Sequence, residues 1–164
     1  MSDNYTELYY HIVWATKDRE PYLTDVVEIE LFNYLATVCR TLRVAIHALN
    51  GMPDHVHLIC SIPPSISISE VVMDLKGKSA YHLNHLPSSD SYLAWQPAYG
   101  VITLSKHHLQ RARLYVNNQK THHADNTVFA RLERCSSISS NVPEGQCAET
   151  SPRLQAGDSR EPRS

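Results

Sequence analysis

The first 62 residues contain short segments in which apolar and polar side chains alternate, the pattern of half-buried strands. Residues 5–16 are rich in aromatic and β-branched side chains and precede a polar turn. Residues 44–49 form a second apolar run, which the turn residues Asn50-Gly51 follow. Residues 55–62 alternate regularly: Val56, Leu58, Cys60 and Ile62 share one face, and His55, His57, Ile59 and Ser61 share the other. These segments predict three strands.

Helical spacing and capping residues predict three helices. Apolar residues recur down one side of residues 27–42, and Thr24 or Asp25 can cap that helix. The residues Ser67-Ile68-Ser69-Glu70 have the form of a capping box, which predicts a helix that ends near Leu86. A fourth strand over residues 99–104 precedes a third helix, which Ser105 can cap and which extends to about His122.

The predicted order β-α-β-β-α-β with a final helix is typical of the ferredoxin-like fold, an α+β architecture that RRM domains share. It implies one antiparallel sheet with helices on one face. The apolar side of residues 55–62 should pack under these helices, which would leave His55 and His57 on the open face. A fold of this kind does not by itself identify a function.

Composition divides the chain into a domain and a tail. Residues 135–164 contain seven Ser, three Pro, two Gly and no aromatic residue. Such a stretch buries too little apolar surface to offset the entropy of ordering it. We therefore expect a folded domain over residues 1–134 and a disordered C-terminal tail over residues 135–164.

Overall composition favours a cytoplasmic protein without a membrane partner. Hydrophobic residues make up 42% of the chain and charged residues 20%, which is ordinary for a globular protein. No apolar run reaches the roughly 18 residues of a membrane span, and the N-terminus lacks the features of a secretory signal. The four cysteines form no close pair, which argues against a zinc knuckle.

Charge is distributed unevenly, although the formal net charge is only −2. Residues 1–38 carry seven acidic and two basic residues. Residues 101–123 carry Lys106, Arg111, Arg113 and Lys120 and no acidic residue. An anionic partner would therefore bind the third predicted helix.

Two groups of side chains are candidates for chemistry. His55 and His57 leave the same face of a predicted strand roughly 7 Å apart, a spacing that can chelate one divalent metal ion. Two surface histidines without a ligand are the alternative. On the third predicted helix, four side chains lie within about 40° of Tyr115 around the helix axis: His108, Arg111, Gln119 and His122. This face offers a possible nucleophile beside an amide, a guanidinium and two imidazoles, with a packing edge as the alternative interpretation.

Four motifs occur in this order: Pro53-Asp54-His55-Val56-His57-Leu58, Leu75-Lys76-Gly77-Lys78-Ser79, Trp95-Gln96-Pro97-Ala98-Tyr99-Gly100 and Tyr115-Val116-Asn117-Asn118-Gln119-Lys120-Thr121-His122-His123. Together they resemble the single-tyrosine HUH transposases of small bacterial insertion sequences, in which HUH stands for His, hydrophobic residue, His. The Trp-Gln and Tyr-Gly elements and the Asn-Gln-x2-His-His ending most resemble the REP-associated tyrosine transposase branch. The resemblance extends from about Tyr9 to His123.

The resemblance implies a metal-dependent nuclease and strand-transferase. Such enzymes act on single-stranded DNA hairpins, at element ends or REP-like repeats, through a covalent 5′-phosphotyrosine. By motif, Tyr115 would be the catalytic nucleophile, and His55, His57 and Gln119 would be the metal ligands. Mg²⁺ or Mn²⁺ is the expected cofactor, because oxygen ligands suit Mg²⁺ and imidazole suits Mn²⁺. The resemblance also implies a catalytic C-terminal helix and a homodimer.

The expected DNA-binding residues are all basic and lie on the second and third predicted helices: Lys76, Lys78, Lys106, Arg111, Arg113 and Lys120. A solvated helix face is the alternative for them. A competing function is a non-catalytic single-stranded or hairpin DNA-binding protein derived from a decayed or domesticated element. Intact Tyr115 and Gln119 favour the enzyme, because binding alone needs neither. An RNA-binding module is disfavoured, because residues 55–60 lack the aromatic-rich RNP pattern.

Overall fold

The computed structural model describes residues 5–87, 92–125, 127 and 132–135. Its strands are β1 (Tyr9–Ala15), β2 (Ala45–Met52), β3 (His55–Ser61) and β4 (Gly100–Leu104). Its helices are a 3-10 turn η1 (Lys17–Arg19), α1 (Asp25–Thr41), α2 (Ile68–Asn84), α3 (Lys106–Asn117) and α4 (Gln119–Ala124). The predicted order of elements and the α+β class are confirmed.

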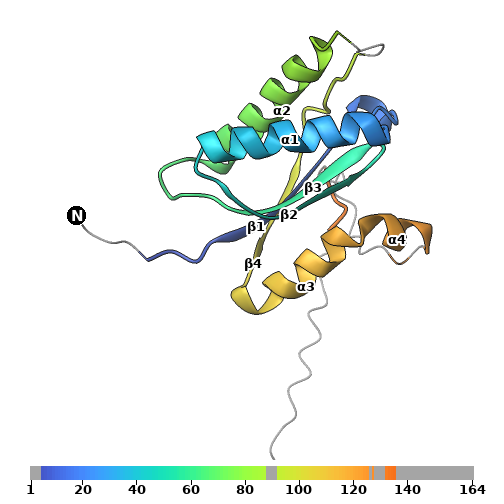
Figure 1. Cartoon of the computed structure of the whole chain (residues 1–164). Coiled ribbons are helices and arrows are strands. Elements are labelled where there is room, and N and C mark those ends of the chain that lie inside the picture. Colours follow the sequence, from blue (N-terminus) through green and yellow to red (C-terminus); the bar gives the residue numbers. More distant parts are fainter. Residues whose placement is uncertain (1–4, 88–91, 126, 128–131, 136–164) are drawn as a thin grey trace, which may run out of the picture.

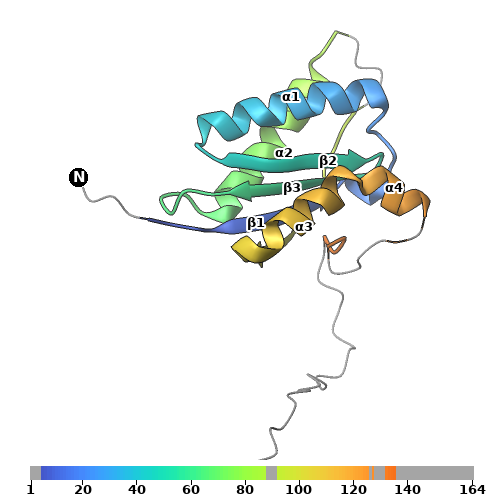
Figure 2. The same cartoon turned by 60° about the horizontal axis from the view of Figure 1, so that its bottom comes forward.

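The four strands form one sheet in the order β2-β3-β1-β4, and each neighbouring pair is antiparallel. The helices α1 and α2 cover one face of the sheet, and α3 and α4 lie against the other (Figures 1 and 2). The main core lies between the sheet and α1 and α2, with Trp14, Leu31, Leu35, Leu58 and Leu75 almost fully buried. β3, which carries the candidate histidines, contributes Val56, Leu58 and Cys60 to this core.

Two of the three predicted helix caps form, and the third does not. The Thr24 side chain accepts from the Val27 N–H, and Ser67 and Glu70 form both bonds of a capping box at the start of α2. Ser105 precedes α3, but its hydroxyl contacts the His108 ring at 2.8 Å and no helix N–H.

The third predicted helix is interrupted, which the sequence pattern did not predict. Asn118 adopts φ −100° and ψ 19° and separates α3 from α4. The Asn50 side-chain amide of β2 donates to the carbonyls of Val116 and Asn117, at 2.8 and 3.2 Å. This contact ties the end of α3 to the sheet just before the chain turns into α4.

The expectation that helices cover only one face of the sheet, leaving the histidine face open, was wrong. That face also carries apolar side chains, Ala48 and Ile59, which pack with Ala112, Tyr115 and Val116 of α3 in a second small core. Burying these side chains draws α3 onto the sheet. His55 and His57 are consequently buried, with 3% and 0% of their surface exposed.

The expected tail begins inside the described part of the chain. Cys135 is 4% exposed and packs against Val13 and Ala15 of β1. Residues 136–164, the rest of that tail, lie outside the described residues. Among the described residues, no helix combines the length and hydropathy that crossing a membrane requires.

Candidate active site

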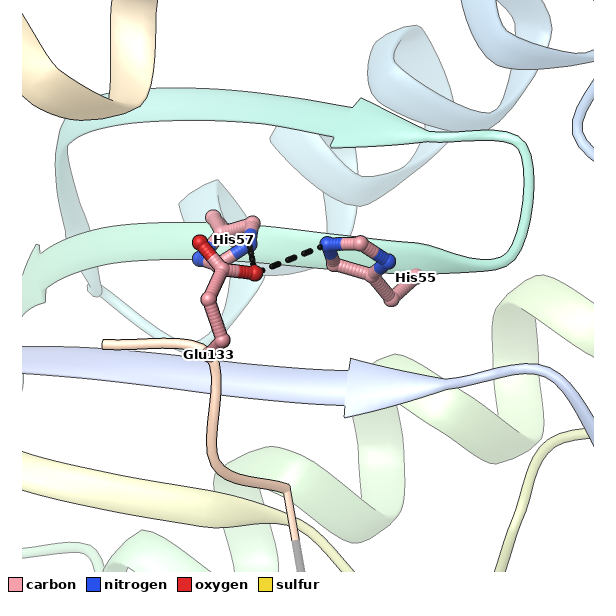
Figure 3. A group of neighbouring side chains, drawn as sticks. All are labelled: His55, His57 and Glu133. Atoms are coloured by element: carbon pink, nitrogen blue, oxygen red, sulfur yellow. Dashed lines mark ion pairs between the residues drawn. The ribbon is translucent and has the colours of Figure 1, made fainter. Parts of the chain in front are cut away.

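The two HUH histidines and one carboxylate form the centre of the site. His55 and His57 project from the same face of β3, with ring centroids 4.9 Å apart. The Nε2 atom of each lies 3.2 Å from Oε2 of Glu133. Glu133 belongs to the short segment 132–135, and Figure 3 shows its carboxylate facing both imidazoles.

A neighbouring side chain contacts the Nδ1 atom of each histidine, on the side of the ring away from Glu133. The Nδ1 of His55 lies 2.6 Å from Oδ1 of Asp54, and the guanidinium of Arg19 donates to the other oxygen of Asp54 at 3.0 Å. The Nδ1 of His57 lies 2.9 Å from Nε2 of His11, a buried residue of β1. Both Nε2 atoms therefore remain directed toward Glu133.

Tyr115 and Gln119 meet at the same carboxylate. The Tyr115 hydroxyl donates to Oε1 of Glu133 at 2.6 Å, and the Gln119 amide donates to the same oxygen at 2.7 Å. The Gln119 amide nitrogen also lies 3.1 Å from Nε2 of His57. The structure thus brings together all four site residues that the sequence proposed for the catalytic and metal roles.

Two further residues complete this cluster. The Nε2 of His123 lies 3.4 Å from Oε2 of Glu133, and the His122 ring stacks on Tyr115 with centroids 4.7 Å apart. His123 ends the motif that begins at Tyr115, but the motif alone does not assign it a role. Glu133 had no local sequence pattern that could have revealed it.

The charges of the site follow from burial and from these contacts. Burial opposes ionisation of Glu133, but contacts with His55 and His57 outweigh it and hold the pKa of Glu133 far below its usual value. Burial would lower the pKa of His55, yet Asp54 and Glu133 raise it overall. Burial lowers the pKa of His57, and it lowers the pKa of His11 to about 3. Near neutral pH, His57 is therefore neutral and has a nitrogen lone pair available.

This donor set fits a divalent cation. The nitrogen atoms of His55 and His57 and a carboxylate oxygen of Glu133 all lie within 4.8 Å of one another. Neighbouring ligand atoms around an octahedral ion with bonds of about 2.1 Å are about 3.0 Å apart, close to the observed 3.2 Å. Among the described residues, His55 Nε2, Gln119 Oε1 and His123 Nε2 are buried without a hydrogen-bond partner. The Gln119 oxygen and, once they are unprotonated, the imidazole nitrogens are electron-pair donors, so the group could bind a metal.

The proposed DNA-binding residues lie in different environments. Ion pairs within the chain engage three of them: Lys78 with Asp74, Lys106 with Glu7 and Lys120 with Glu28. The Lys76 ammonium donates to the backbone carbonyls of residues 96, 97 and 98, and Arg113 donates to the His47 carbonyl. Arg111 lines a cavity of about 490 Å³ between β4 and α3, and Tyr115 and His108 line it too. Arg111 therefore shares this cavity with Tyr115.

Comparison with known proteins identifies the family. The sequence model described as "Transposase IS200 like" matches residues 4–119. The chain is 30% identical over 118 residues to the ISDra2 transposase TnpA of Deinococcus radiodurans, covering 69% of this chain and 84% of that protein. It is 34% identical over 74 residues to the IS200 transposase of Salmonella typhimurium, covering 45% of this chain and 49% of that protein.

Solved structures agree. A candidate transposase from D. radiodurans R1 superposes with a TM-score of 0.55 at 33% identity, covering 73% of this chain and 96% of that one. A REP-associated tyrosine transposase bound to a REP hairpin superposes with a TM-score of 0.56 at 18% identity, covering 75% and 74%. The chain therefore belongs to the IS200-like transposase family, whose members are enzymes of the single-tyrosine HUH type.

Proposed function

We propose that this transposase cleaves and rejoins single-stranded DNA hairpins through a covalent bond to Tyr115. The main support for this proposal is the convergence of four side chains. The Tyr115 hydroxyl, the Gln119 amide and the His55 and His57 imidazoles converge on a single carboxylate, with each contact at 3.2 Å or less. A nucleophile and a candidate metal site thus face the same point.

Mg²⁺ or Mn²⁺ is the proposed cofactor. His55, His57 and Glu133 would hold it, and Gln119 would join them once its amide turns so that the unpartnered Oε1 faces the histidines. A bound divalent ion would polarise the scissile phosphate and stabilise charge in the displacement. A site of two imidazoles and one or two oxygens leaves positions open for phosphate oxygens, and it suits Mn²⁺ at least as well as Mg²⁺.

Tyr115 supplies the attacking oxygen. A free phenol has a pKa of about 10, so the hydroxyl must lose its proton as it attacks. The bond to Glu133 and the stacked His122 ring fix the orientation of the phenol. A new bond forms between the phenolic oxygen and phosphorus, the bond from phosphorus to the 3′-oxygen breaks, and that oxygen takes up a proton. The phosphotyrosine conserves the energy of the phosphodiester, so rejoining needs no nucleotide cofactor.

The substrate and the assembly are part of the proposal. The structural relative that binds a REP hairpin supports hairpin DNA, although its 18% identity carries only the fold. Arg111, which lines the same cavity as Tyr115, would contact the DNA beside the nucleophile. The other five basic residues would bind the DNA backbone by exchanging their present partners for phosphates: Lys76, Lys78, Lys106, Arg113 and Lys120. The family resemblance supports a homodimer.

A denaturing gel tests the proposal. The chain is incubated with a labelled single-stranded hairpin and Mg²⁺ or Mn²⁺, with EDTA and the fully duplex DNA as controls. We expect a labelled band at the mass of protein plus DNA that EDTA and duplex DNA both abolish. Hairpin binding without any adduct in either metal would support the competing function, a non-catalytic DNA-binding protein.

A further inference from the structure

His11 is a buried polar residue that the proposed reaction does not use directly. It lies on β1, next to β3 in the sheet, and only 2% of its surface is exposed. It projects from the same face as His57, because His11 pairs with Ile59 and Val13 pairs with His57 in the antiparallel register. A polar side chain buried to this degree requires a hydrogen-bond partner.

That partner is His57. The two rings are almost parallel, with an interplanar angle of 7° and centroids 5.1 Å apart. Their closest nitrogen atoms, His11 Nε2 and His57 Nδ1, are only 2.9 Å apart. Rings stacked face to face keep their atoms at least about 3.5 Å apart. The rings therefore meet edge to edge, and one proton lies between two nitrogen atoms.

The position of this proton determines what His57 can bind. A neutral imidazole carries one N–H, so a proton on Nδ1 leaves a lone pair on Nε2, and a proton on Nε2 removes it. Two groups approach Nε2 of His57: the Gln119 amide nitrogen at 3.1 Å, which can only donate, and the Glu133 carboxylate at 3.2 Å, which can only accept. A cation held between Nε2 and that carboxylate requires the unprotonated Nε2 that the Gln119 contact fits. His57 then donates its Nδ1–H to His11.

We infer that His11 is a positioning residue that accepts the Nδ1–H of His57 and so keeps His57 in the tautomer whose Nε2 faces the cation site. The inference depends on the metal role proposed above for His57. Asp54 does the same for His55, because its carboxylate can only accept from Nδ1. One histidine is thus fixed by a charged acceptor and the other by a neutral one. Such outer partners of metal-binding histidines typically change metal affinity by about 10- to 100-fold.

Two substitutions separate this role from simple packing. His11→Gln can place an amide oxygen near the present Nε2 and keep an acceptor. His11→Leu keeps a side chain of similar size but removes the hydrogen-bond acceptor. Ile12→Val, on the opposite face of the same strand, is the control for a weakened core. Long-range ¹H–¹⁵N spectra of the metal-free proteins report the tautomer of His57, and titration with Mn²⁺ alone reports affinity.

We expect His57 to carry its proton on Nδ1 in the wild type, in His11→Gln and in Ile12→Val, and to lose that preference in His11→Leu. Mn²⁺ affinity should fall about 10- to 100-fold in His11→Leu and stay within about threefold in the other two variants. A wild-type His57 protonated on Nε2 would overturn the inference, even if His11→Leu fails to fold. Unchanged affinity in a folded His11→Leu would overturn it as well. If these results hold while hairpin DNA yields no adduct, the proposed function fails and the role of His11 stands.

Discussion

Replacing Gly100 by alanine should dislodge the segment that carries Glu133. A Cβ atom on Gly100 would overlap the carbonyl oxygen of Arg134 and lie 2.9 Å from its carbonyl carbon. Relief to an ordinary contact distance of about 3.4 Å requires the segment to move by about 1.5 Å. A shift of that size stretches the bonds from Tyr115 and Gln119 to Glu133, now 2.6 and 2.7 Å, beyond hydrogen-bonding range.

The expected magnitude follows from these two bonds. Each joins a neutral donor to a carboxylate and contributes about 1.5–3 kcal/mol, so docking of the segment should weaken by about 3 kcal/mol or more. A loss of 3 kcal/mol raises the undocked population by roughly 100-fold. Tryptic cleavage after Arg134 requires the undocked segment, so its rate should rise by a similar factor. Mn²⁺ affinity should fall in parallel, because Glu133 is a proposed ligand.

Gly77→Ala is the matched control. A Cβ atom there meets nothing within 4 Å, and Gly77 lies inside α2. That variant should be more stable by about 0.5–1 kcal/mol and leave both the cleavage rate after Arg134 and the metal affinity unchanged. If folded Gly100→Ala showed the cleavage rate and Mn²⁺ affinity of the wild type, the segment would not be docked as described.

Three further changes test other parts of the account. His57→Ala should abolish hairpin cleavage, while its affinity for the hairpin in a gel-shift assay stays within about tenfold of the wild type, because binding relies on phosphate contacts elsewhere. Full cleavage by this variant with Mg²⁺ would exclude the metal role of His57. Glu133→Gln should lower Mn²⁺ affinity, measured by calorimetry, by at least about tenfold through loss of a charged oxygen ligand, and a higher affinity would show that Glu133 competes with the ion. Deleting residues 136–164 should change the melting temperature by no more than about 2 °C, since their composition offers little apolar surface, and a fall of about 10 °C would show that they pack on the domain.

The elements that local sequence determines were predictable. Alternation defined β3, and the Ser67 capping box placed the start of α2 within a residue. The face shared by Tyr115 and Gln119 was also predictable, because helical geometry relates residues one turn apart. Even with the interruption at Asn118, both side chains reach the same carboxylate.

The parts that were missed depend on tertiary contacts. His11 and His57 are 46 positions apart, and only the pairing of β1 with β3 brings them together. Glu133 approaches the histidines because Gly100 leaves room for the Arg134 backbone. The spacing of residues along the sequence cannot predict such a contact. The burial of the histidine face depends on Ala48 and Ile59 packing against α3. Periodicity identified a face of β3 but not what would cover it.

Mapping the covalent adduct tests the central claim most directly. After reaction with a hairpin and Mn²⁺, nuclease digestion trims the DNA to a short phosphonucleotide, and trypsin releases the peptide of residues 114–120, which contains Tyr115 as its one tyrosine. We expect mass spectrometry to find the phosphonucleotide on that peptide in the wild type and in a Tyr99→Phe control. Tyr115→Phe removes only the attacking oxygen, so it should bind hairpin DNA and form no adduct. A phosphonucleotide on another tyrosine, or undiminished cleavage by Tyr115→Phe, would contradict the account.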